Sequence, residues 1–138
     1  MNRPARATAG VVRQLHVRPR QPEYSQAFAR LSALEKRFPG VKRVTDAAEA
    51  LCLIEQAAFS DNLGLVISSH RPSGLDGPAF VAELHTRMPG LPVLVLGDSL
   101  DSAREYSGDW VRFLPRPVAA EEMLAAASHM LAKAAYTV

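Results

Sequence analysis

Short apolar runs alternate with segments of helical periodicity along the whole chain. Two of the runs, LGLVISS at 63–69 and PVLVL at 92–96, contain no charged residue. Such runs are typical of strands that are covered on both faces of a sheet. Weaker runs of the same kind predict three further strands at 11–17, 41–45 and 110–114.

Between the strands, apolar side chains recur every three or four residues, which predicts amphipathic helices. Pro39-Gly40 and Pro89-Gly90 end two of these segments, and Asp46 with Glu49 forms a capping box at the start of another. A strand followed by a helix, repeated five times, requires parallel strands, right-handed connections and helices on both faces. We therefore expect a doubly wound α/β fold. The predicted helices cover 22–38, 47–58, 78–88, 99–107 (short) and 119–135.

The length and composition indicate one globular domain, because 138 residues with 48% hydrophobic and 22% charged side chains can bury a substantial core. No apolar run approaches the ~18 residues of a membrane span. The single cysteine, Cys52, cannot form an internal disulfide. We expect a cytoplasmic protein, with residues 1–10 as a flexible basic leader and 11–138 as the domain.

The net charge of +2 conceals an uneven distribution. Residues 1–43 contain ten Lys or Arg and two acids, whereas residues 44–138 contain six and twelve. A basic third could contact nucleic acid or an acidic partner. However, no basic run exceeds two residues and no aromatic residues interleave with such a run, so we interpret this part as a solvated face and expect no nucleic-acid binding.

The chemistry of such a sheet gathers outside the carboxyl ends of its strands. Arg18 and Arg20 follow the first predicted strand, Ser69 ends the third, Gly97 follows the fourth and Arg116 follows the fifth. Neither a P-loop nor a G-x-G-x-x-G sequence follows any strand, so a nucleotide-binding half-fold is not supported.

Three segments resemble the response-regulator receiver domain family. LVISSHRPSGLDGPAF (65–80) resembles the third strand and the loop after it, PGLPVLVLGDS (89–99) the fourth strand, and RFLPRPV (112–118) the fifth strand and its Lys-Pro. The resemblance extends over residues 11–135. It implies a flavodoxin-like (CheY-like) sheet of order 2-1-3-4-5 and a role in two-component signal transduction or a phosphorelay, not as an enzyme.

The sequence departs from that family at the residues that carry its chemistry. Receivers accept a phosphoryl group on an Asp where this chain has Ser69, and hold a divalent cation with two acids where it has Arg18 and Arg20. Their Thr or Ser after the fourth strand is Gly97 here, and their Lys after the fifth is Arg116. We interpret these five positions as a degenerate phosphorylation site.

These departures exclude the usual chemistry of the family. Mg²⁺ prefers carboxylate oxygens, which two arginines cannot replace, and a serine alcohol needs a base before it can act as a nucleophile. We therefore expect no metal and no cofactor. Phe113 takes the place of the family's switch aromatic. The favoured function is a stand-alone pseudo-receiver that works by protein–protein interaction, with a histidine kinase or a signalling output protein as partner.

Three alternatives remain open. Arg18, Arg20 and Arg116 could bind a small anion or a nucleotide, because guanidinium groups offer forked donors, or could pair with Asp76 and Asp98 as a fixed lock. The chain could also be a phosphorelay receiver that is phosphorylated at an unusual residue. A serine hydrolase built on Ser69 and its neighbouring histidine is not favoured, because the G-x-S-x-G elbow is missing.

The last predicted helix carries an apolar band wider than one core stripe needs, so we expect part of it to face outward. Receiver-like domains pair through the fourth helix, fifth strand and fifth helix, and aromatic, Met and Arg side chains are enriched at interfaces. A homodimer or partner surface is expected at Tyr106, Trp110, Met123, Ala126 and Met130.

Overall fold

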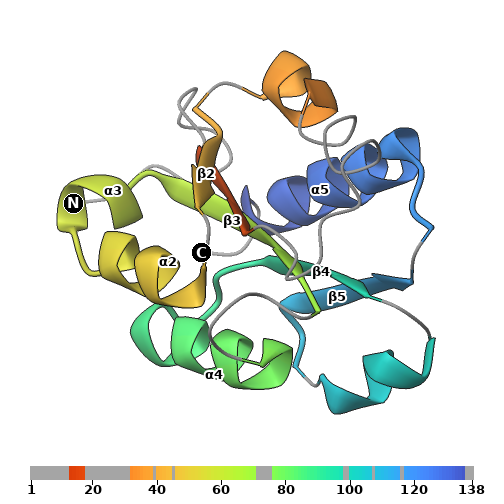
Figure 1. Ribbon diagram of the computed structural model, residues 1–138. Coiled ribbons are helices and arrows are strands. Elements are labelled where there is room, and N and C mark those ends of the chain that lie inside the picture. Colours follow the sequence, from red (N-terminus) through yellow and green to blue (C-terminus); the bar gives the residue numbers. More distant parts are fainter. Residues whose placement is uncertain are drawn as a thin grey trace.

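A five-stranded parallel sheet forms the centre of the molecule, with strand order β2-β1-β3-β4-β5 (Figure 1). This computed structural model describes residues 13–17, 32–38, 40–44, 46–70, 76–97, 100–106, 108–115 and 117–135. The order confirms the predicted doubly wound, flavodoxin-like architecture. The strands are β1 (Arg13–Val17), β2 (Lys42–Val44), β3 (Leu63–Ser69), β4 (Val93–Gly97) and β5 (Val111–Pro115).

The helices follow the strands as predicted, with one exception. Residues 32–37 are helical, and the remainder of the helix expected over 22–38 lies largely outside the described residues, as does the leader at 1–10. Two aspartates cap helices at their N-termini. Asp46, as predicted, accepts from the Glu49 amide, and Asp76 accepts from the Ala79 amide, both at 2.8 Å. The other helices are α2 (Ala47–Ile54), α3 (Ala57–Ser60), α4 (Gly77–Arg87), the 3₁₀ helix η2 (Leu100–Glu105) and α5 (Ala120–Ala135).

The prediction of a single helix over 47–58 is wrong, because this segment is divided into α2 and α3. Gln56 adopts an extended backbone conformation between them. The break has a packing reason: a continuous helix would turn Phe59 away from the face that buries Ala50 and Ile54, whereas the interrupted chain buries Phe59 in the same core.

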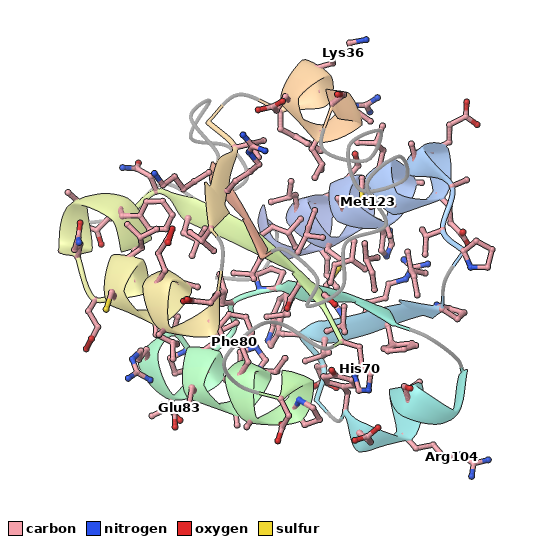
Figure 2. All side chains as sticks on the ribbon, in the orientation of Figure 1. Lys36, His70, Phe80, Glu83, Arg104 and Met123 are labelled. Atoms are coloured by element: carbon pink, nitrogen blue, oxygen red, sulfur yellow. The ribbon has the colours of Figure 1, made fainter. Side chains whose placement is uncertain are left out.

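Both faces of the sheet are covered, so every residue of β3 and β4 is buried. One core joins the sheet to α2, α3 and α4 and contains Phe80, Val93 and Val95. The other joins it to α5 and the 32–37 helix and contains Leu94 and Met123. Alternate residues of β4 thus enter opposite cores, and Figure 2 shows Phe80 and Met123 on either side of the sheet.

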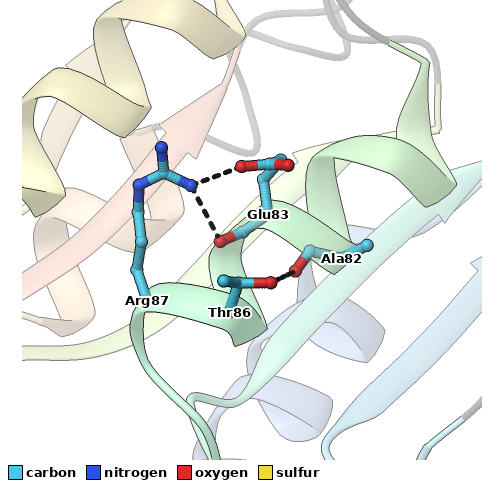
Figure 3. A network of polar contacts seen from close by, with 4 residues as sticks. All are labelled: Ala82, Glu83, Thr86 and Arg87. Carbon is cyan, nitrogen blue, oxygen red and sulfur yellow. Dashed lines mark hydrogen bonds and ion pairs between the residues drawn. The ribbon is translucent and has the colours of Figure 1, made fainter.

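The outer face of α4 carries ordinary surface contacts (Figure 3). Arg87 pairs with the Glu83 carboxylate at 2.5 Å, and the hydroxyl of Thr86 donates to the carbonyl of Ala82 at 2.9 Å. The hydrogen bond to Glu83 raises the pKa of the Arg87 guanidinium, which therefore stays charged. This network lies near the end of α4, away from the carboxyl ends of the strands. None of the described helices is long and apolar enough to cross a membrane.

Candidate functional site

The carboxyl ends of β3, β4 and β5 lie together at one edge of the sheet, as parallel pairing requires. Ser69 pairs with Leu96 in the register of β3 and β4, and Gly97 pairs with Pro115 in that of β4 and β5. The structure therefore brings Ser69 and Gly97 to the same edge. Arg18, Arg20, Asp98 and Arg116 lie outside the described residues, so the expected arginine cluster and its lock stay predictions.

Ser69 ends β3 as a buried alcohol, with only 6% of its surface exposed. The preceding Ser68 is also buried and donates its hydroxyl to the Ser69 carbonyl at 2.9 Å. Strand pairing continues one residue further, since the His70 amide donates to the Leu96 carbonyl at 2.8 Å. The end of β3 thus offers no carboxylate for acyl-phosphate formation.

An aromatic ring fills the space in which a side chain of Gly97 would lie. A Cβ atom added to Gly97 would overlap the ring of Phe113, far closer than real Cβ atoms approach other atoms. Phe113 is opposite Val95 in the sheet register and packs against the core on the α4 side. The ring therefore fills the space that a Thr or Ser side chain would need at this position.

His70 joins the same site, which the sequence did not reveal. The sequence presented it only as a neighbour of Ser69, but its Nδ1 lies 2.6 Å from the Tyr106 hydroxyl and its Nε2 lies 3.5 Å from the Glu105 carboxylate. A histidine directly after a wholly buried strand was the available signal, because a buried ring nitrogen needs a partner. Its partner, Tyr106, is 36 positions away in the chain, and pattern alone cannot pair them.

The three rings of the site pack edge to face or tilted. The centroid of His70 lies 5.5 Å from that of Tyr106 and 6.0 Å from that of Phe113. Tyr106 and Phe113 are 5.8 Å apart. These separations fall in the range that favours aromatic contacts. Figure 2 shows His70 at the junction of the sheet, α4 and η2.

Burial raises the pKa of the Tyr106 hydroxyl, and the carboxylates of Glu105 and Asp76 raise it further. The hydroxyl therefore keeps its proton at physiological pH. The protonated hydroxyl of Tyr106 can donate to Nδ1 of His70, whose Nε2 faces the Glu105 carboxylate. Both ring nitrogens of His70 thus face other side chains, Tyr106 and Glu105.

The expected interface on α5 is wrong for three of its residues. Met123, Ala126 and Met130 are buried in the core at 0%, 2% and 7% exposure. The wide apolar band is needed because α5 covers the sheet and also packs near the 32–37 helix in one core. Tyr106 and Trp110 are partly exposed, and the Trp110 ring lies 5.3 Å from the Lys133 ammonium in a cation–π contact.

Within the described part of the chain, no group of three or more His, Cys, Asp or Glu side chains could hold a metal ion. Asp76, expected near the site as a partner for arginine, is exposed and caps α4.

Solved receiver structures share this fold at low sequence identity. A response regulator receiver protein from Sinorhizobium medicae WSM419 is 19% identical, with a TM-score of 0.72 over 90% of this chain and 96% of that one. A CheY-like receiver domain protein from Methanospirillum hungatei JF-1 is 18% identical, with 0.73 over 90% and 96%. The chemotaxis response regulator CheY4 of Vibrio cholerae is 20% identical, with 0.71 over 87% and 98%.

The sequence itself matches no protein-family model and no curated protein. At these identities the likeness shows the fold, and the function has to be argued from the site.

Proposed function

We propose that this chain is a pseudo-receiver in two-component-type signalling, which binds a protein partner without being phosphorylated on aspartate. The coarse role follows the fold, since the similar solved structures are receiver proteins and domains of response regulators. The finer claim depends on the carboxyl edge of the sheet.

The observation that carries the proposal is the pair Gly97 and Phe113. Gly97 has no hydroxyl with which to contact a phosphoryl group, and the Phe113 ring occupies the space where a longer side chain would stand. Ser69 adds a buried alcohol in place of a carboxylate. Both features support a site that is built for packing rather than for phosphoryl transfer.

A mass measurement tests the claim directly. The intact protein, incubated with acetyl phosphate and Mg²⁺, is expected to keep its mass, because Ser69 has an alcohol in place of a carboxylate and Gly97 has no hydroxyl. A receiver that has aspartate at the end of its third strand serves as the positive control and must gain one phosphoryl group.

A stable mass gain in the wild-type chain would overturn the proposal. The matched variant Ser69→Ala then locates the acceptor. Loss of the gain in this variant would make Ser69 an unusual phosphorelay acceptor, and persistence of the gain would place the acceptor elsewhere.

The partner surface that we propose lies over η2, β5 and α5. Arg104 and Arg112 are exposed there, and Trp110 is partly exposed beside Lys133. Trp and Arg are residue types enriched at protein interfaces, and the ring already has one cation above it. This face would bind a second copy of the chain or a signalling partner. It does not include Met123, Ala126 and Met130 of α5, because these side chains are buried.

A further inference from the structure

We propose that His70, Tyr106 and Phe113 form an aromatic lock that fixes η2 in one position on the sheet, with Gly77 and Gly97 making the room it needs. The lock extends the proposed function, on which its signalling meaning rests: it would hold the η2 face in a single state without a phosphoryl group.

The lock begins with a short hydrogen bond between distant elements. Tyr106 directly follows η2, and its hydroxyl lies 2.6 Å from Nδ1 of His70, which directly follows β3. The side chain of His70 is 7% exposed, whereas that of Glu105 is 56% exposed. Buried hydrogen bonds are screened less by water, so the bond to Tyr106 holds η2 more strongly than the pair with Glu105.

Two glycines give the rings their places. A Cβ atom on Gly77, the first residue of α4, would overlap the Tyr106 hydroxyl and the backbone oxygen of His70. A Cβ atom on Gly97, the last residue of β4, would overlap the Phe113 ring. The lock therefore draws on β3, α4, β4 and β5 together, and any other residue at either glycine would open it.

Tyr106 is also the anchor that ties this segment to the interior. Among residues 102–106 and 108–110, whose side chains the structure describes, Tyr106 is the one packed against a hydrophobic core. Its amide donates to the Ala103 carbonyl at 3.2 Å, which connects the anchor to the turn of η2. Releasing the hydroxyl should therefore loosen η2 before it loosens the sheet.

Hydrogen exchange of backbone amides, followed by NMR or mass spectrometry, tests the lock on the full chain. Tyr106→Phe keeps the ring and removes the hydroxyl. Exchange within 100–106 is expected to rise roughly fivefold to tenfold, the equivalent of one lost hydrogen bond. Exchange in β3 and α5 is expected to stay unchanged, which a general loss of stability would not produce.

Two substitutions of His70 separate its two nitrogens. His70→Asn places an acceptor near the position of Nδ1 and should retain most of the protection of η2. His70→Gln places its amide near the position of Nε2 and should behave like Tyr106→Phe. Glu105→Gln, which alters the exposed pair, should leave η2 protected.

A substitution of Gly97 tests the position of the Phe113 ring directly. In Gly97→Ala the Phe113 ring must move, so its nuclear Overhauser contacts to His70 are expected to disappear while η2 exchange rises. Unchanged exchange in Tyr106→Phe would overturn the lock, and this mild variant decides the matter even where substitutions of His70 or Gly97 fail to fold.

The lock and the proposed function can fail separately. Acetyl phosphate and Mg²⁺ added to the wild-type chain are expected to leave η2 exchange unchanged. A phosphorylated chain whose Tyr106→Phe variant still loosens η2 would reject the pseudo-receiver and keep the lock. An unmodified chain whose variant leaves η2 protected would reject the lock and keep the pseudo-receiver.

Discussion

At the scale of single residues, the absence of one carbon atom decides the shape of the site at two places. Gly77 and Gly97 each make room for a neighbouring side chain, Tyr106 in one case and Phe113 in the other. Neither glycine has a backbone conformation that requires glycine, since the positive φ angles among the described residues belong to Gly40, Gly90 and Gly108. Their role is therefore steric, and substitutions test it.

Gly77→Ala is expected to destabilise the fold by about 1–3 kcal/mol, the usual cost of overpacking. Alanine favours a helix over glycine by about 1 kcal/mol, so propensity alone predicts the opposite sign. The overlap includes the backbone oxygen of His70, which cannot swing aside as a flexible side chain could. Urea unfolding measures the change in the free energy of unfolding.

Thr86→Ala, on the exposed face of the same helix, is the control and should stay within about 0.5 kcal/mol of the wild type. A stabilised Gly77→Ala variant would show that Tyr106 and His70 adapt freely, against the tight packing described above.

The raised pKa of Tyr106 predicts loss of stability at alkaline pH. The phenol ionises near pH 10 in the unfolded chain but at higher pH in the folded protein. Its contribution is therefore complete below about pH 10 and declines as the pH rises above that value. The decline should stay well under the limit of about 1.4 kcal/mol per pH unit, because the side chain is partly exposed.

Urea unfolding of wild type and Tyr106→Phe between pH 8 and about 11 measures this contribution, since the pKa of an unperturbed tyrosine is about 10. The difference in free energy of unfolding between the two proteins should shrink as the pH rises. A constant difference would mean that the hydroxyl ionises equally in both states.

At the scale of elements, periodicity predicted the described strands and the helices α4, η2 and α5 within one or two residues, but it did not show which helix faces stay exposed. The apolar band of α5 predicted an outward surface, yet Met123 and Met130 are core residues. A sequence shows how wide a band is, and only the fold shows how many neighbours cover it. The break between α2 and α3 was hidden for the same reason, since the burial of Phe59 depends on the sheet.

The candidate site was predictable in position but not in contacts. The carboxyl edge, Ser69 and Gly97 follow from the order of the elements, because parallel strands place their ends together. The bond between His70 and Tyr106 does not, because it joins two loops through a geometry that neither segment encodes alone.

Two variants, Met123→Ala and Trp110→Ala, should distinguish a residue needed for stability from one needed for self-association. The first is expected to cost about 2–5 kcal/mol of stability, since Met123 is fully buried, and to leave self-association unchanged. The second should weaken any homodimer and change stability less. Light scattering coupled to gel filtration, with urea unfolding, measures both effects, and a strictly monomeric wild type at high concentration would remove the homodimer.

At the scale of the whole molecule, the two outer strands of the sheet differ from the central strands. β3 and β4 are fully buried, whereas β2 and β5 are the outer strands. β2 has three residues, of which Lys42 and Arg43 are exposed, and β5 ends at Pro115, which has no amide proton.

Short, charged or proline-bounded outer strands hinder the addition of further strands from another chain. The β-ladder therefore has little capacity to grow, which guards the molecule against fibrous aggregation. It also favours contact between two copies through side chains rather than through added strands, as on the face proposed above, where single-residue changes could create or abolish the contact.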